Sequence, residues 1–139
     1  MQANPVSGSA NADVLHRFVA AFNAKDEDAL GKILTPDVVD HHLPTGLPAC
    51  IDGLKTWLGI VWAAFDAKLN LDDVVAAGDR VATRWTFAGT HIGEFNGLPA
   101  SGRGFSVQGM SIEHIADGRI AERWETADLR SLLQQINPA

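Results

Sequence analysis

The sequence is poor in the residues that build several common kinds of site. Its 139 residues include a single cysteine, Cys50, which excludes an internal disulfide and a zinc site built from cysteines. The 11 Lys and Arg residues form no basic run, and the formal net charge is -6. Because binding to nucleic-acid phosphates depends on clustered Lys and Arg, we expect no nucleic-acid partner.

Long apolar runs are also missing. No run approaches the roughly 18 residues of a membrane-spanning helix, and the N-terminus lacks the basic and then apolar regions of a signal peptide. We therefore expect no membrane partner and a cytoplasmic location. The length and the apolar fraction of 46% suit one globular domain. We expect a flexible tail over residues 1–10 and a single domain over residues 11–139.

The first half of the chain has the pattern of helices. Apolar residues recur at the spacing of one helix face from Val14 to Phe22, after a possible N-cap at Asn11. Asp26 offers a second N-cap, and Pro36 ends that helix. A short strand follows, and a third helix then carries Trp57 and Trp62 on a wide apolar face. Core packing is the default role of these tryptophans, but an indole edge could also line the mouth of a pocket.

From residue 69 the pattern changes to strands. Two long alternating runs flank Asp117-Gly118, and an Asp-Gly between such runs is a strong signal of a β-hairpin. We expect the hairpin over residues 106–128 to be central to the sheet. Helices followed by antiparallel strands predict an α+β fold. In it, a curved, mostly antiparallel sheet packs on the N-terminal helices and forms a cone whose open end makes a pocket.

Polar residues outside the hairpin leave several alternatives open. His41 and His42 are neighbours at a strand end, so at most one can face a given pocket, and no third metal ligand follows at a recognisable spacing. Arg84 faces opposite to Trp85 and fits either an exposed strand position or a substrate contact. His91 belongs to a long glycine-rich connection, and connections of that length are often functional.

Four segments resemble the SnoaL-like polyketide cyclases, also called ester cyclases: HHLPTGLP at 41–48, GDRVATRWTF at 78–87, GTHIGEFNGLPASGR at 89–103 and ADGRIAERW at 116–124. The resemblance implies the nuclear transport factor 2-like fold, a cone-shaped α+β barrel, and a homodimer or higher homo-oligomer. It also implies an intramolecular aldol cyclisation of a small apolar ligand that contains a carbonyl group, with no metal and no organic cofactor.

Such a reaction needs a general base, and in the family an Asp on the last strand serves, with His and Gln side chains nearby. The last strand here offers Glu122, Glu125 and Asp128. We expect Asp128, at the strand end, to be the base, with Glu125 as its rival. Asp128 could equally be the N-cap of a helix that begins at Leu129. The expected catalytic residues are Asp128, Glu125, His41 and Gln108, and the expected ligand-binding residues are His42, Trp57, Trp62, Arg84, His91, Met110, Glu122 and Trp124.

Two other functions fit the same pocket. The protein could bind a small apolar ligand without chemistry. It could also open epoxides, which would need an Asp-Arg-Asp arrangement around a water molecule, and Arg84 and Asp128 could be members of that arrangement. An isolated carboxylate with a raised pKa in the cone would favour the cyclase or a related isomerase, whereas a purely apolar cone would favour binding alone.

Overall fold

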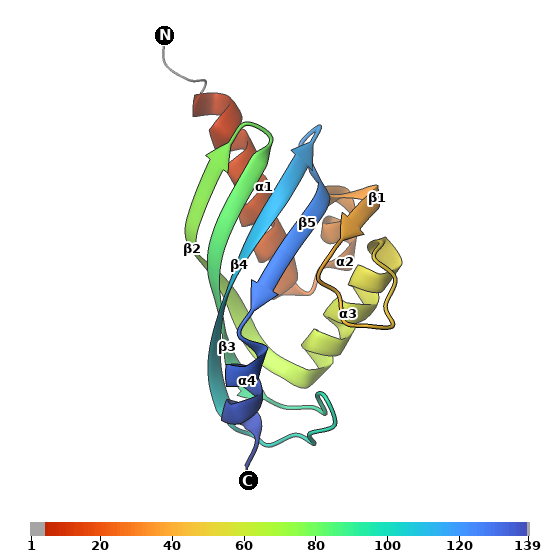
Figure 1. The fold of residues 1–139 in the computed structure, drawn as a ribbon, viewed down its shortest axis with the longest axis vertical. Helices are drawn as coiled ribbons and strands as arrows, with labels where there is room; N and C mark the ends of the chain where they lie inside the picture. Colours follow the sequence, from red (N-terminus) through yellow and green to blue (C-terminus); the bar gives the residue numbers. More distant parts are fainter. Residues whose placement is uncertain (1–4, 139) are drawn as a thin grey trace.

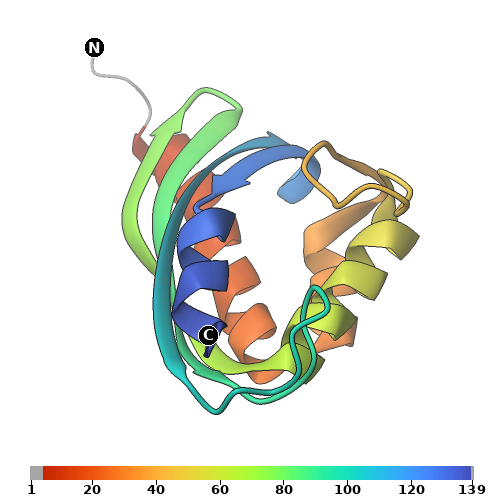
Figure 2. The same cartoon turned by 60° about the horizontal axis from the view of Figure 1, so that its bottom comes forward.

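The computed structural model describes residues 5–138, and this part of the chain forms four helices and five strands. The strands make one open sheet in the order β1-β5-β4-β3-β2. The sheet curves around the helices, and the last helix lies inside the curve (Figures 1 and 2). The predicted α+β class is confirmed. In chain order the elements are α1 (Pro5–Ala24), α2 (Glu27–Ile33), β1 (Leu34–Asp40), α3 (Ile51–Ala64), β2 (Phe65–Ala77), β3 (Arg80–His91), β4 (Gly104–Ala116), β5 (Arg119–Ala127) and α4 (Leu129–Ile136).

Strands β4 and β5 form the hairpin predicted around Asp117-Gly118. Both turn residues have positive φ, 51° at Asp117 and 74° at Gly118, as the tight two-residue turn of a hairpin requires. Each strand of the hairpin has a neighbour on both sides, β3 and β5 for β4, and β4 and β1 for β5. The hairpin is therefore central to the sheet, as predicted.

Strand β1 completes the sheet in a way that the sequence pattern does not predict. It pairs with β5 in parallel, with Val39 opposite Glu122 and Asp40 opposite Arg123. All other strand pairs are antiparallel. The parallel pair carries the end of β1, and the two histidines that follow it, to the side of the last strand.

A β-bulge in β5 changes which side chains face the helices. Ile115 of β4 lies opposite Ile120, but the preceding His114 lies opposite Glu122, so Ala121 is an extra residue. An extra residue reverses the alternation of faces along a strand. As a result Ile120 and Arg123, three positions apart, are both buried, with exposed fractions of 0% and 5%.

The helix ends differ from the predictions at two places. Helix α2 ends at Ile33, and Pro36, expected to end it, lies inside strand β1. Helix α1 begins at Pro5 rather than after Asn11, and the Asn11 side chain donates a hydrogen bond to the Gly78 carbonyl at 2.9 Å. Residues 1–4 of the expected tail lie outside the described residues, and the flexibility of the tail stays a prediction. Asp26 caps α2 as predicted, because its carboxylate accepts a hydrogen bond from the Ala29 N–H at 3.0 Å.

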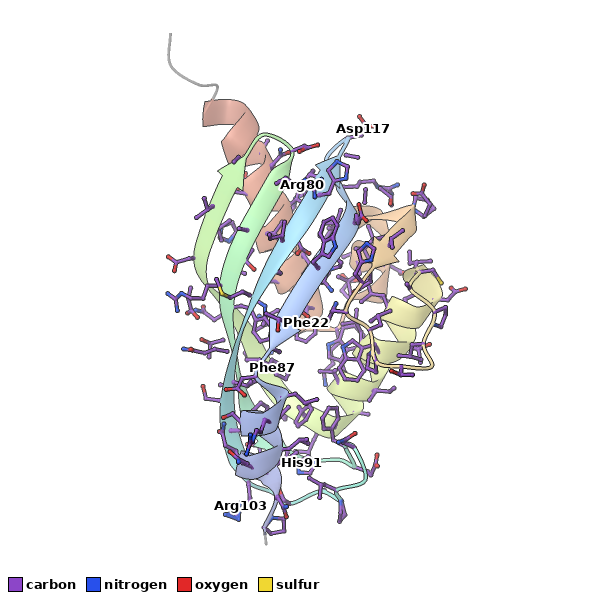
Figure 3. The ribbon with its side chains drawn as sticks, viewed as in Figure 1. Phe22, Arg80, Phe87, His91, Arg103 and Asp117 are labelled. Atoms are coloured by element: carbon purple, nitrogen blue, oxygen red, sulfur yellow. The ribbon has the colours of Figure 1, made fainter. Side chains whose placement is uncertain are left out.

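The core lies between the inner face of the sheet and the helices. Phe22 of α1, Phe65 of β2 and Phe87 of β3 make tilted or edge-on ring contacts at centroid distances of 5.8–6.0 Å, geometries that aromatic pairs prefer. Phe22 and Phe87 lie midway along the molecule, between Asp117 at one end and His91 at the other (Figure 3). Among the described helices, none combines the length and apolar character needed to cross a membrane.

Candidate active site

A cavity of about 150 Å³ lies between the inner face of the sheet and helices α1, α3 and α4. Three of its 18 lining residues are ionisable, namely His42, Arg123 and Glu125. The other 15 are apolar: Phe18, Phe22, Leu54, Trp57, Leu58, Val61, Phe65, Leu69, Trp85, Phe87, Phe95, Val107, Ala127, Leu129 and Leu132. The cavity is thus an apolar chamber with polar groups gathered at β5 and at the end of β1.

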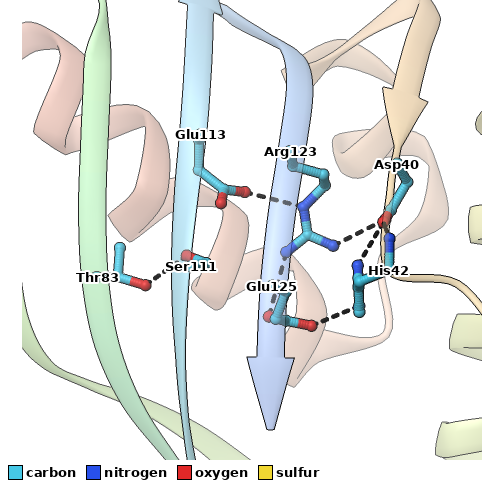
Figure 4. A network of polar contacts seen from close by, with 7 residues as sticks. All are labelled: Asp40, His42, Thr83, Ser111, Glu113, Arg123 and Glu125. Carbon is cyan, nitrogen blue, oxygen red and sulfur yellow. Dashed lines mark hydrogen bonds and ion pairs between the residues drawn. The ribbon is translucent and has the colours of Figure 1, made fainter.

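Arg123 organises the polar groups. Its guanidinium donates hydrogen bonds to three carboxylates, through Nε to Glu113 Oε1 at 2.9 Å, through Nη1 to Asp40 Oδ2 at 3.0 Å and through Nη2 to Glu125 Oε2 at 3.4 Å (Figure 4). Burial alone would lower the pKa of Arg123, but the three carboxylates outweigh burial and raise this pKa further above its ordinary value. Arg123 is therefore a permanent buried cation.

His42 bridges two of these carboxylates. Its Nδ1 lies against Asp40 Oδ1, and its Nε2 lies 2.6 Å from Glu125 Oε1 (Figure 4). Burial works against a charged imidazole, but the hydrogen bonds to Asp40 and Glu125 outweigh it and raise the pKa of His42 to about 9. At neutral pH the ring is an imidazolium with an N–H directed at each carboxylate.

The carboxylates divide into two kinds. Burial alone would raise the pKa of Asp40 and of Glu125, but Arg123 and His42 hold both below their ordinary values. Burial dominates at Glu113 and raises its pKa, although Arg123 opposes the shift. Glu113 is fully buried and its Oε2 has no partner among the described residues. The two cations, Arg123 and His42, thus contact all three carboxylates between them.

The arrangement suits proton transfer at the wall of an apolar chamber. Glu125 is the one carboxylate among the described lining residues, and it is ionised and hydrogen-bonded to a charged histidine. A carboxylate in such a place can accept a proton from carbon, and an imidazolium beside it can supply one to oxygen. Asp40 and Glu113 do not line the chamber, and they hold His42 and Arg123 in place.

The structure brings three of the predicted site residues to the cavity, His42, Trp57 and Glu125. Of the two adjacent histidines, His42 faces the cavity. His41 instead stacks on Trp124 with ring centroids 5.0 Å apart, and its Nε2 lies 2.6 Å from Glu122 Oε2. The three side chains lie on the outer face of the sheet, because the bulge at Ala121 reverses the alternation that would have placed Glu122 and Trp124 inside.

Three more expected residues belong to the outer face. Along β4 the buried positions are Val107 and Gly109, so Gln108 and Met110 point outward, and Met110 is 57% exposed. Arg84 is exposed and its Nε lies 2.8 Å from Asp73 Oδ2, which is the paired strand position named as its alternative. Polarity along a strand does not by itself tell which face is the inner one.

Three further expected residues lie away from the chamber. Trp62 packs against Phe22, with ring centroids 5.8 Å apart. His91 is fully buried at the other end of β3, where its Nδ1 accepts a hydrogen bond from the Ser101 N–H at 3.2 Å. Asp128 is exposed and caps α4, because its carboxylate accepts a hydrogen bond from the Ser131 N–H at 3.1 Å. Of the two roles left open for Asp128, the structure places it in the cap.

The charged residues of the network that the expected site left out are Arg123, Asp40 and Glu113. Arg123 lies next to Trp124 in the sequence, and only the bulge turns it inward. Asp40 is buried by the parallel pairing of β1, for which the sequence has no local signal. For Glu113 the sequence offers one signal, namely a charged residue among apolar residues on an expected strand.

Solved structures with the same fold are known. TsrD from Streptomyces laurentii is 32% identical, with a TM-score of 0.83 over 94% of this chain and 97% of that one. IdmH from Streptomyces antibioticus is 33% identical, with a TM-score of 0.81 over 90% of this chain and 96% of that one. The fold is the α+β cone of the nuclear transport factor 2-like kind, with a sheet that does not close.

Two characterised relatives are cyclases. The chain is 26% identical to aklanonic acid methyl ester cyclase DnrD from Streptomyces peucetius over 92% of its own length and 91% of the relative. It is 28% identical to nogalonic acid methyl ester cyclase from Streptomyces nogalater over 85% of its own length and 90% of the relative. The family model for SnoaL-like polyketide cyclases matches residues 12–136. The chain therefore belongs to the SnoaL-like polyketide cyclase family.

Proposed function

We propose that this protein is a cytoplasmic, cofactor-independent cyclase that closes a ring in a small polyketide-like ester by an intramolecular aldol reaction. The observation that carries the proposal is Glu125, the one carboxylate among the described lining residues of an apolar chamber. Contrary to the expectation for such a base, the pKa of Glu125 is not raised, because Arg123 and His42 outweigh burial and hold it below its ordinary value. The support for Glu125 as the base is therefore its position in the wall of the chamber, beside a charged histidine that can supply a proton. The two named cyclase relatives support the reaction class.

In the proposed mechanism Glu125 takes a proton from a carbon between two carbonyl groups. The resulting enolate attacks a ketone carbonyl of the same molecule, so that one C–C bond forms and the ketone oxygen becomes an alkoxide. Protonation removes the negative charge of Glu125 and weakens its hydrogen bond with the His42 Nε2–H. His42 can then donate that proton to the alkoxide. The proton on Glu125 then returns to His42, which restores the starting state.

Substitution at the two competing acids tests the base. Wild type, Glu125→Gln and Asp128→Asn are given aklanonic acid methyl ester and nogalonic acid methyl ester in D2O. Ring closure is followed by chromatography, and deuterium uptake at the acidic carbon by mass spectrometry. We expect Glu125→Gln to slow turnover about 10²- to 10⁴-fold, and Asp128→Asn to leave it unchanged.

The other outcomes of this experiment are equally clear. Loss of turnover in Asp128→Asn but not in Glu125→Gln would assign the base to Asp128. Wild type that neither closes nor exchanges either ester faster than buffer would favour a ligand-binding protein without catalysis. In that case the chamber serves as a binding site alone.

A second candidate function has one specific observation in its favour. Arg123 lies between the carboxylates of Asp40 and Glu125, which resembles the Asp-Arg-Asp arrangement of epoxide opening with Glu in place of one Asp, and with Asp40 outside the chamber. This set replaces the expected one, because Arg84 and Asp128 lie away from the chamber. Incubation with styrene oxide in H₂¹⁸O separates the functions, since hydrolysis incorporates the label into a diol and aldol closure leaves epoxides untouched.

We also propose a homodimer through the outer face of the sheet. Val75, Ala82, Ile112 and Trp124 form one row across four strands, and Val75 and Ile112 are 62% and 47% exposed. Exposed apolar surface of this kind commonly marks an interface. Sedimentation should show a dimer for wild type and a monomer for Ile112→Lys. The control Ile60→Lys, at an exposed position on α3, should remain a dimer, and a monomeric wild type at micromolar concentration would contradict the proposal.

A further inference from the structure

The chamber is small for the ligand that the proposed function requires. Its volume is about 150 Å³, whereas pockets that enclose drug-sized ligands start at about 300 Å³. An engineered apolar cavity of about 150 Å³ in another protein holds one benzene molecule. The chamber therefore has room for about one ring, and the rest of a larger ligand must lie outside it.

A groove of about 580 Å³ lies against the same end of the molecule. It runs between α4 and the connection from β3 to β4, the two segments that come forward in Figure 2. Its walls combine apolar and amide side chains with one cation. They are formed by Asn96, Leu98, Leu129, Arg130, Leu133, Gln134 and Asn137.

Leu129 lines both the chamber and the groove. It is the first residue of α4 and is 48% exposed. The next turns of the helix separate the two spaces, because Leu132 faces the chamber and Leu133 the groove. A ligand that occupies both would therefore pass Leu129.

Arg130 is the charged residue of the groove. Its side chain is exposed and makes no hydrogen bond or ion pair with any described residue. This differs from Arg123 in the chamber, whose guanidinium is engaged by three carboxylates. A guanidinium presents N–H donors in a planar fork that matches a carboxylate.

We propose that the groove is the outer half of the ligand site, and that Arg130 binds a carboxylate on the part of the ligand that extends past Leu129. The substrate would then carry a carboxylate at the groove, in addition to an apolar ring in the chamber and the ester and ketone groups that the proposed reaction needs. The inference rests on the proposed function, because it treats the groove as an extension of the same site. It adds a second anchor, which no residue of the chamber provides.

Phenylalkanoic acids, from phenylacetic to phenylhexanoic acid, test the proposal together with their methyl esters and toluene. Toluene probes the chamber alone, and the difference between each acid and its ester isolates the carboxylate. Binding is measured by calorimetry at low salt to wild type, Arg130→Gln, His42→Gln and Arg17→Gln. Arg17 is an exposed arginine on α1, so Arg17→Gln makes the same change of charge away from the groove.

We expect toluene to bind wild type, Arg130→Gln and Arg17→Gln alike. Beyond one chain length, the acids should bind wild type about two- to fivefold more tightly than their esters, the gain that an exposed ion pair supplies. Arg130→Gln should abolish this preference and Arg17→Gln should keep it. High salt should weaken the preference as well, because exposed charges are screened.

Two results would overturn the inference. One is a preference for acids that persists in Arg130→Gln. The other is a preference lost in His42→Gln rather than in Arg130→Gln, which would place the carboxylate in the chamber. Toluene binding without any preference for acids would reject the groove alone, and failure to bind toluene would reject chamber and groove together. Acid binding through Arg130 in a wild type without turnover would reject the catalytic function and leave the groove site standing.

Discussion

The charge of His42 should make the stability of the protein depend on pH above neutrality. The pKa of His42 is raised from 6.5 to about 9 by its hydrogen bonds to Asp40 and Glu125, against the effect of burial. A folded-state pKa above the unfolded value means that the folded protein holds the proton more tightly. The stabilisation is therefore complete below pH 6.5 and is lost as the pH rises through 9.

The size of the effect follows from the shift. One pKa unit corresponds to about 1.4 kcal/mol, so the rise to about 9 amounts to roughly 3 kcal/mol in the free energy of unfolding. His42 is 18% exposed at its side chain, so screening by solvent reduces this only modestly. Urea unfolding at pH 6 and pH 9.5 measures the loss for wild type and for His42→Gln, whose side chain does not titrate.

The difference between the two proteins isolates His42 from other groups that titrate in the same range. The pKa of Glu113 is also raised, so its contribution to the free energy of unfolding also falls as the pH rises. Glu113 is present in both proteins, and its contribution cancels in the difference. We expect wild type to lose about 3 kcal/mol more than His42→Gln between the two pH values. Equal losses would show that the charge of His42 is not held by the fold, and the role assigned to its contacts with Asp40 and Glu125 would be wrong.

Substitutions at three residues test other contacts by urea unfolding. Arg123→Met should cost about 3–5 kcal/mol, because it removes the cation that contacts three carboxylates and leaves His42 alone to offset their negative charge, and a loss below about 1 kcal/mol would contradict the described network. Gly109→Ala should cost about 1–3 kcal/mol and shift the tryptophan emission, because the new Cβ would lie 2.1 Å from Trp85 Cζ2, and an unchanged spectrum would argue against that contact. Asp128→Ala should cost about 1 kcal/mol through loss of the α4 cap, whereas Asp128→Asn should cost less, and equal losses would contradict the capping role.

Local signals account for the parts of the fold that could be predicted. The turn at Asp117-Gly118 needs two residues with positive φ, and Asp-Gly is a preferred pair for that purpose. The caps at Asp26 and Asp128 depend on one side chain and an N–H three residues later. Each of these features lies within a few residues of sequence, so composition and spacing are enough to find it.

The candidate site depends on features without a local signal. Counting two by two from Ile120 places Glu122 and Trp124 inside, and the extra residue Ala121 reverses this result. The inward position of Arg123 and Glu125 follows from the bulge, which depends on how β4 and β5 pair. For this reason the expected residues included Glu122 and Trp124, which face outward, and left out Arg123, the buried arginine that links Glu125 to the end of β1.

The parallel pairing of β1 with β5 also determines when the site can form during synthesis. Asp40 and Arg123 are 83 positions apart, so the buried ion pairs cannot form until β5 has left the ribosome. Contacts between distant segments carry a loop-closure cost and slow folding. A nascent chain that ends before β5 would hold α1, α2 and α3 without the partner of β1. We expect such a chain to lack the buried ion pairs, and the site to form only after β5 has left the ribosome.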